Sequence, residues 1–206
     1  MTASEFAETS NVSRETLNRL ETYLSLITHW QNAINLVGPK TLADPWRRHF
    51  LDSAQLIDHI SLNTDPVYDL GSGAGLPGIV LAILGKSNIH LVESDQRKAQ
   101  FLNEVSRVLG LDATIHTQRI ETLPKNCATI VTARALAPLP RLIKLAFPLL
   151  RTNSHCLFLK GQSVSDELTE ACKCWRMTID LVPSRSDPSA SILKLRDIVR
   201  APLHRE

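Results

Sequence analysis

Three glycines at alternate positions mark the segment of this chain best suited to hold a ligand against the backbone. They are Gly71, Gly73 and Gly75. An apolar run ends on Asp69 just before them, which predicts a buried strand that breaks into a tight turn. Pro77 follows and suits the first turn of a helix, because its missing N–H would be unsatisfied there anyway. A strand, a glycine turn and a helix in this order favour a nucleotide-type cofactor site, contacted by Asp69 and the three glycines.

The spacing of the glycines bears on the class of cofactor. Gly73, Gly75 and Gly78 satisfy the G-x-G-x-x-G pattern of dinucleotide enzymes, in which the first glycine directly follows the strand. Here Gly71 holds that place, and counting from it puts Leu76 where the third glycine belongs. The remaining pattern, acid-x-Gly-x-Gly-x-Gly, resembles the cofactor loop of class I S-adenosylmethionine methyltransferases. An NAD-dependent oxidoreductase stays as the alternative function.

An acid at the end of the next apolar run fits a ribose. Glu93 follows residues 88–92 and lies about twenty residues beyond the glycine turn, where an acid meets ribose hydroxyls in βαβ nucleotide sites. Helix capping is the other role open to such an acid. Ser94 and Asp95 stand closer to the helix predicted over 96–109 and suit the N-cap better. We therefore expect Glu93 to bind the ribose of the cofactor.

The rest of the chain alternates between predicted strands and helices. Further strands are predicted over 113–117, 127–132 and 154–159, with helices over 139–150 and 164–174. Such alternation implies an α/β fold with a mostly parallel sheet covered on both faces. Two final extended segments, 177–181 and 192–199, have no helix between them and should form a C-terminal hairpin. The pattern resembles the seven-stranded, Rossmann-like sheet of class I methyltransferases.

The N-terminal part reads as a helical extension. Apolar residues recur at helical spacing over 13–33, with Ser13 as the candidate N-cap, and a second helix is predicted over 44–60. We expect residues 1–62 to pack on a methyltransferase domain formed by residues 63–206, in one structural unit.

The second helix carries a basic and aromatic cluster. Arg47, Arg48 and His49 directly follow Trp46. Guanidinium and aromatic groups together bind phosphates and stack on bases, so the cluster is a candidate RNA-binding segment. The alternative is a helix in which Trp46 and Phe50 anchor the extension while the charges face water.

Composition sets broad limits on the function. A chain of 206 residues with 43% hydrophobic residues can bury one full core. Its net charge of +2 argues neither for nor against a nucleic-acid partner. No apolar run is long enough for a membrane span, and no signal pattern is present at the N-terminus, so we expect a cytoplasmic protein. The four cysteines lack the spacing of a metal site.

The residues after the fourth predicted strand limit the methyl acceptor. Enzymes that methylate an exocyclic amine carry an Asn/Asp-Pro-Pro-aromatic run there, whereas this chain reads Thr132-Ala133-Arg134-Ala135. No Pro-Cys pair supplies a thiolate for attack on a pyrimidine ring. An acceptor with a free lone pair and no proton to lose, such as guanine N7, needs neither. Alignment of the reacting atoms would then suffice, without a catalytic general base.

Nearly the whole chain resembles one family, the bacterial small-subunit ribosomal RNA guanine-N7 methyltransferases, also called glucose-inhibited division protein B. The resemblance rests on five segments: residues 35–36, Arg-His-Phe-Leu-Asp-Ser at 48–53, Asp-Leu-Gly-Ser-Gly-Ala-Gly-Leu-Pro-Gly at 69–78, Arg-Ala at 134–135 and Leu-Lys-Gly at 159–161. It implies methyl transfer from S-adenosylmethionine to N7 of the guanine at position 527 of 16S rRNA, either as RNA or in the small ribosomal subunit. An RNA-binding assembly factor without turnover remains a further alternative.

The resemblance also implies cofactor contacts. They fall on Gly71, Leu76, Ile120, Glu121 and Arg134, with Ile120 and Glu121 beside the adenine. Arg134 could reach either the methionine carboxylate or the RNA.

For RNA binding we nominate four residues: Arg47, Arg48, His49 and Lys160. Lys160 ends a predicted strand on the sheet edge where doubly wound proteins bind ligands.

Overall fold

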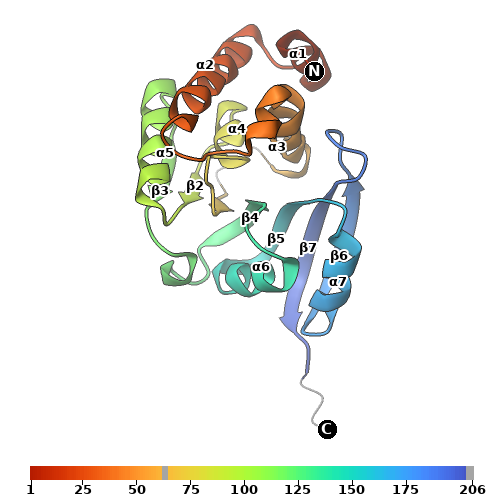
Figure 1. Ribbon diagram of the computed structural model, residues 1–206. Helices are drawn as coiled ribbons and strands as arrows, with labels where there is room; N and C mark the ends of the chain where they lie inside the picture. The colour runs from red at the N-terminus through yellow and green to blue at the C-terminus, as the bar shows by residue number, and fades with distance from the viewer. Residues whose placement is uncertain (62–64, 203–206) are drawn as a thin grey trace.

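The computed structural model describes residues 1–61 and 65–202, and in this part of the chain seven strands form one sheet (Figure 1). The strand order is β3-β2-β1-β4-β5-β7-β6. Strands β1 to β5 run parallel, and β7 pairs antiparallel with both β5 and β6. The predicted fold, a mostly parallel sheet that ends in a C-terminal hairpin, is therefore confirmed.

Most strand bounds lie within two residues of those predicted, but β5 begins at residue 150 and not 154, because the preceding α-helix ends at residue 146 and not 150. The strands are β1 (Val67–Leu70), β2 (Ile89–Val92), β3 (Ala113–His116), β4 (Ala128–Arg134), β5 (Leu150–Lys160), β6 (Trp175–Pro183) and β7 (Ser191–Arg200). The longer helices are α1 (Ala3–Ser10), α2 (Arg14–Gln31), α4 (Gly78–Ile83), α5 (Gln96–Leu109), α6 (Leu139–Ala146) and α7 (Val164–Cys172). The short helices are η1 (Pro39–Ala43), η2 (Trp46–Leu51), α3 (Asp52–Ala54), η3 (Gln55–His59), η4 (Ile120–Thr122) and η5 (Phe147–Leu149).

Helices cover both faces of the sheet. Figure 1 shows α2, α4 and α5 on one side and α6 and α7 on the other. Two hydrophobic clusters separate in the same way, since Val67 belongs to the cluster under α4 and α5 while its neighbour Tyr68 belongs to the one under α6. Successive side chains of a strand point to opposite faces, so each strand contributes to both cores.

The N-terminal helices share a core with the sheet. Leu20, Tyr23 and Ile27 form the buried stripe of α2, and they belong to the same hydrophobic cluster as residues of α4 and α5. Ser13 caps α2 as predicted, accepting a hydrogen bond from the backbone N–H of Thr16. The proposed boundary between residues 62 and 63 lies outside the described residues.

The second predicted helix is irregular. Residues 46–59 form three consecutive short helices, η2, α3 and η3, of which η2 is a π-type turn. A π-type turn holds more residues than an α-helical turn and is frequent at functional sites. Within η2, Phe50 packs against Tyr23 in the core while Arg48 stays half exposed at the surface.

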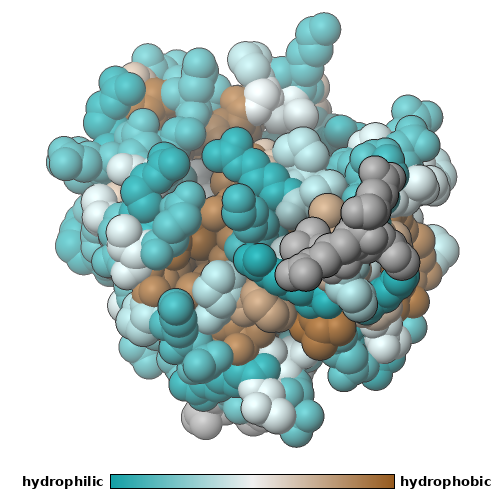
Figure 2. Space-filling view, turned by 90° about the horizontal axis from the view of Figure 1, so that it is seen from below, coloured by the Kyte–Doolittle hydropathy of each residue, from teal (hydrophilic) through white to brown (hydrophobic). Residues whose placement is uncertain are grey.

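The face of the molecule seen in Figure 2 is mostly hydrophilic, with hydrophobic residues in patches between hydrophilic ones. None of the described helices combines the length and the apolarity that a membrane crossing requires. The described residues hold no group of three His, Cys, Asp or Glu side chains that could bind a metal ion.

Candidate functional site

The glycine turn lies at the carboxyl end of β1, and its three alternating glycines all adopt positive φ but differ in what a side chain would meet. Gly71, Gly73 and Gly75 have φ values of 63°, 54° and 86°. A Cβ on Gly71 would lie 2.4 Å from a methyl group of Leu136, and one on Gly75 would lie 2.4 Å from Ile79. A Cβ on Gly73 would meet nothing closer than a carbonyl oxygen at 3.8 Å. Gly75 is therefore required by core packing, whereas Gly73 faces open space.

Asp69 lies beneath this turn and not in the cavity. Its carboxylate is fully buried and accepts hydrogen bonds from the Thr132 hydroxyl at 3.0 Å and the Gly78 N–H at 3.2 Å. Burial raises the pKa of Asp69 to about 6, although these hydrogen bonds favour the ionised form. Asp69, like Gly75, lines neither of the two cavities described next, so the structure gives both residues a supporting position where direct contact was expected.

Two cavities meet at the turn, with volumes of about 820 Å³ and about 300 Å³. Both are lined by Gly71, Gly73, Lys98, Ala135 and Leu136. They are therefore two halves of one site, joined over bare backbone.

The smaller cavity is lined by acidic and apolar side chains beside the glycine turn. They include Glu93, predicted from its place in the sequence, and Ile120 and Glu121, which the family resemblance implied. The Glu93 carboxylate is held in place by the N–H of Gly73 at 2.9 Å and the N–H of Asp95 at 2.8 Å. Each carboxylate oxygen has a second lone pair, so Glu93 can still accept hydrogen bonds from a diol.

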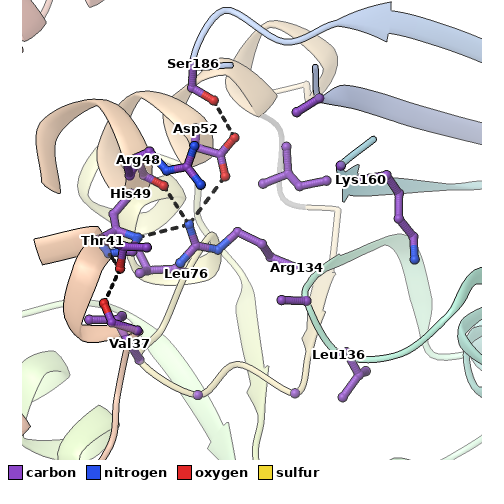
Figure 3. A pocket seen from close by; sticks show the side chains of 18 of the residues that line it. Val37, Thr41, Arg48, His49, Asp52, Leu76, Arg134, Leu136, Lys160 and Ser186 are labelled. Atoms are coloured by element: carbon purple, nitrogen blue, oxygen red, sulfur yellow. Dashed lines mark hydrogen bonds and ion pairs between the residues drawn. The ribbon is translucent and has the colours of Figure 1, made fainter. Parts of the chain in front are cut away.

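The larger cavity is built from distant parts of the chain. Residues 36–52, the glycine turn with Leu76, the loop after β4, the end of β5 with Lys160, and the loop between β6 and β7 all contribute to its wall (Figure 3). A pocket assembled from segments so far apart in the chain exists only in the folded protein.

Arg134 at the end of β4 connects the sheet to η2. One terminal nitrogen donates to the carbonyl of Arg48 at 3.0 Å and to His49 Nδ1 at 3.2 Å, and lies 3.4 Å from a carboxylate oxygen of Asp52 (Figure 3). The side chain of Arg134 is 18% exposed. The arginine is therefore held in one position at the wall of the larger cavity.

His49 is a neutral acceptor in this arrangement. Burial, with the positive charges of Arg134 and Arg48, lowers the pKa of His49 to about 4. Nδ1 accepts from Arg134, so Nε2 carries the proton and donates to the Thr41 hydroxyl at 2.9 Å. Thr41 in turn donates to the carbonyl of Gly38 at 2.6 Å. A directed chain of hydrogen bonds thus runs from β4 to the segment before η1.

Lys160 is also engaged within the protein. Its ammonium group donates to the carbonyl of Ala137 at 3.0 Å and to Glu167 at 2.7 Å, and its side chain is 9% exposed. Glu167 further accepts the N–H of Leu139 at 2.6 Å. Lys160 and Glu167 thereby fix the loop after β4, and both line the larger cavity, so an RNA contact by Lys160 stays a prediction.

Comparison with known proteins identifies the relatives of this chain. The family described as rRNA small subunit methyltransferase G matches residues 16–185. The chain is 53% identical to the ribosomal RNA small subunit methyltransferase G of Rhodospirillum rubrum, over 98% of this chain and all of that protein. It is 50% identical to the protein of the same name from Paramagnetospirillum magneticum, over 97% of this chain and 98% of the other.

The chain belongs to the rRNA small subunit methyltransferase G family. Solved structures with far lower identity share its fold. A SAM-dependent methyltransferase from Aquifex aeolicus matches 76% of this chain and 95% of its own, with a TM-score of 0.58 and 14% identity. M. jannaschii TYW2, solved in complex with AdoMet, matches 82% of this chain and 80% of its own, with a TM-score of 0.58 and 13% identity.

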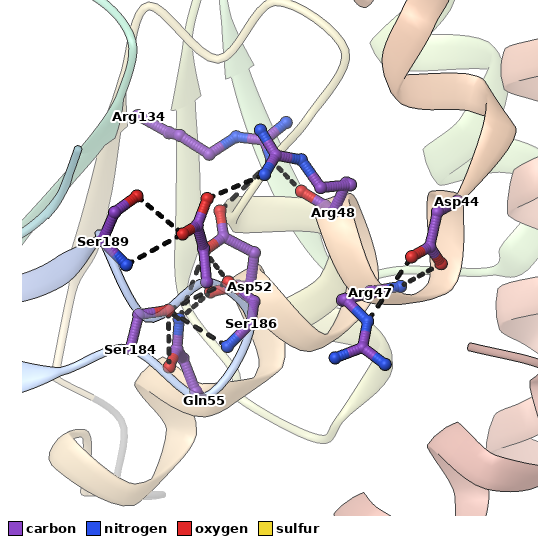
Figure 4. A network of polar contacts seen from close by, with 10 residues as sticks. Asp44, Arg47, Arg48, Asp52, Gln55, Arg134, Ser184, Ser186 and Ser189 are labelled. Carbon is purple, nitrogen blue, oxygen red and sulfur yellow. Dashed lines mark hydrogen bonds and ion pairs between the residues drawn. The ribbon is translucent and has the colours of Figure 1, made fainter. Parts of the chain in front are cut away.

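In this member of the methyltransferase G family, the two neighbouring arginines of η2 have different surroundings. Arg48 lines the larger cavity and forms an ion pair of 2.8 Å with Asp187 in the loop between β6 and β7. Arg47 does not line the cavity and lies 3.4 Å from Asp44 (Figure 4). Of the predicted RNA-binding cluster, Arg48 alone is both at the cavity and half exposed.

Several wall residues of this family member escape prediction from the sequence. The loop between β6 and β7 packs against the helices of residues 46–59, where Ser186 donates to Asp52 at 2.7 Å and Gln55 donates to Ser184 at 3.0 Å (Figure 4). Asp52 belongs to the motif at 48–53, so the resemblance offered one signal for it. The loop between β6 and β7 is rich in Pro, Ser and Asp, and this composition predicts only a connection between two strands.

Proposed function

We propose that this protein transfers the methyl group of S-adenosylmethionine to N7 of the guanine at position 527 of 16S rRNA. The observation that supports this most directly is the pair of cavities that meet over Gly71 and Gly73. One cavity has the size and the polar groups for a nucleoside, and the other is open and large enough for a base presented by a second molecule. Membership of the methyltransferase G family supports the same reaction.

The cofactor fits the residues of the smaller cavity. Glu93 would accept from the ribose hydroxyls, Ile120 would pack on the adenine, and Glu121 would meet its edge through the backbone. Gly73 offers a close approach, since its N–H is already oriented by Glu93 and a side chain would project into open space. The bound cofactor supplies an electrophilic methyl group on a sulfonium.

The remaining wall serves positioning and not proton transfer. N7 of guanine would bond to the methyl carbon through its lone pair as the carbon–sulfur bond breaks, leaving a neutral thioether and a positively charged base, so no proton would have to be removed and no general base is required. Arg134 lines only the larger cavity, which would hold the methionine end and the acceptor base. Three protein acceptors on one side fix its guanidinium, and a fixed cation can orient either of these two groups.

The reaction is tested by the chemistry of its product. Unmethylated small-subunit RNA, or small ribosomal subunits, is incubated with the protein and S-adenosylmethionine and then treated with borohydride and aniline. Cleavage at the target guanine is expected, because N7-methylguanine is labile to this treatment. Absence of cleavage under conditions in which the cofactor binds would reject the proposed reaction.

Binding measurements separate the alternative functions. Isothermal titration should show binding of S-adenosylmethionine and its demethylated product and none of NAD, whereas an NAD-dependent oxidoreductase would give the reverse. An RNA-binding assembly factor would bind RNA without producing the cleavage site. A ribosomal RNA substrate also leads us to propose the cytoplasm as the location of the protein.

A further inference from the structure

Positive charge is concentrated in one segment of this chain. Residues 117–151 contain a single acidic residue, Glu121, and six basic ones: Arg119, Lys125, Arg134, Arg141, Lys144 and Arg151. The whole chain has a net charge of only +2, so the residues outside this segment are net negative. An asymmetry of this kind sets the local potential of one face, which the total charge conceals.

The fold arranges five of these cations, all except Arg134, along α6. Leu139, Leu142, Ile143 and Ala146 bury one side of this helix. Arg141 and Lys144, three residues apart, share the exposed side. At the end of α6 nearer the glycine turn, Arg119 and Arg141 both line the smaller cavity.

Lys125 and Arg151 lie at the other end of α6. The N–H of Asn126 donates to the carbonyl of Pro148 at 3.0 Å, and Arg151 donates to the carbonyl of Asn126 at 3.1 Å. These contacts place the loop of Lys125 beside the end of the helical segment α6–η5. The basic stripe is defined as Arg119, Lys125, Arg141, Lys144 and Arg151. It begins at the cofactor cavity, includes the exposed side of α6, and ends at the loop beside the far end of the helical segment.

The stripe is not neutralised by the protein. Within the described residues its one ion pair is that of Arg119 with Glu121, at 3.8 Å. Exposed cations elsewhere have closer partners, such as Lys173 with Glu170 at 2.7 Å and Arg196 with Asp180 at 2.8 Å. Like charges gathered without carboxylates raise the free energy of the isolated protein and favour a polyanionic partner.

We propose that the basic stripe binds the phosphate backbone of the substrate RNA beside the target nucleotide, on the cofactor side of the site. This inference rests on the proposed function, which supplies the RNA. An eight-residue helix is about 12 Å long, which matches on the order of three phosphates of one strand. The stripe would contact phosphates and not the edges of bases, so it adds affinity and orientation without sequence preference.

The test removes the three stripe residues that line neither cavity. The variant Lys125→Ala/Lys144→Ala/Arg151→Ala is compared with Arg14→Ala/Lys173→Ala/Arg176→Ala, which removes the same charge from exposed positions elsewhere. Binding of small-subunit rRNA is measured over a range of salt concentrations, and cofactor binding is measured by titration. A single Lys144→Glu exchange provides a second stripe variant with minimal effect on folding.

The stripe variant should reduce the slope of log affinity against log salt by roughly 2, because each phosphate contact contributes about 0.7 to 0.9. Its KM for RNA should rise while kcat and cofactor affinity stay unchanged, and Lys144→Glu should shift KM in the same direction. Equal salt slopes for the stripe and control variants would overturn the proposal. If the wild-type protein binds RNA through the stripe but never methylates it, the proposed function is rejected and the proposal for the stripe still holds.

Discussion

The exchange Tyr23→Phe tests whether the N-terminal helices hold the cofactor turn in shape. Tyr23 lies on α2, is fully buried, and donates its hydroxyl hydrogen bond to the carbonyl of Ala74 between two of the glycines. Phenylalanine keeps the ring and its stacking on Phe50, at 5.7 Å between centroids. The exchange therefore removes one hydrogen bond from the carbonyl of Ala74, a residue that is only 4% exposed.

The magnitude follows from the burial of that carbonyl. An acceptor left unsatisfied in a buried place costs about 1 to 3 kcal/mol. If the turn keeps its conformation, the full cost should appear as a lower free energy of unfolding in urea. If the turn relaxes, part of the cost should appear as weaker cofactor binding, at tenfold for each 1.4 kcal/mol or so.

The other tyrosine of the chain provides the control. Tyr68 belongs to the hydrophobic cluster on the opposite face of the sheet and stacks on His90, with 4.3 Å between the ring centroids. Tyr68→Phe should leave cofactor affinity unchanged. Unfolding free energy and cofactor affinity both equal to wild type in Tyr23→Phe would refute the view that α2 supports the turn.

Further predictions concern the glycine turn, the buried titrating groups and the basic residues. Gly73→Val should abolish cofactor binding in titration, because the new side chain would fill the space above the turn and a β-branched residue is strained at φ 54°. The circular dichroism spectrum should stay nearly unchanged, since no core side chain lies within 4 Å of the new Cβ; retained affinity would place the cofactor elsewhere. The pKa of Asp69 is raised to about 6 in the folded protein from an ordinary value of 3.8, so the folded state binds the proton more tightly than the unfolded state. The free energy of unfolding of the wild type, relative to Asp69→Asn, should therefore fall by up to about 3 kcal/mol as pH rises from 4 to 6. The lowered pKa of His49, about 4 against 6.5, has the opposite sign, and wild-type stability relative to His49→Gln should rise over pH 4 to 6.5; urea unfolding across this range would show both trends or contradict them. Arg48→Ala should weaken RNA binding more than cofactor binding. Lys160→Met should lower the free energy of unfolding by about 1.5 to 3 kcal/mol through its lost charged hydrogen bonds, and should affect RNA binding only through the loop after β4. A larger loss of RNA affinity in Lys160→Met than in Arg48→Ala would show that the two roles are exchanged.

Local patterns in the sequence determined the elements of this fold. Helix α5 begins and ends where its N-cap Asp95 and its terminal Gly110 indicate, and the buried stripe of α2 follows its apolar spacing. The C-terminal hairpin follows from two extended segments without a helix between them. These features depend on neighbouring residues and on capping, which is why the chain itself reveals them.

The tertiary structure alone decided which polar side chains meet. Asp69 lies under the turn because Thr132, from the adjacent strand, and Gly78 satisfy its carboxylate. Lys160 faces inward because Glu167 on α7 and the loop after β4 surround its ammonium group. A buried charge is stable only where partners from other elements satisfy it, and those partners are chosen by packing across the chain. No local pattern encodes that choice, so the sequence named these residues while the fold assigned their places.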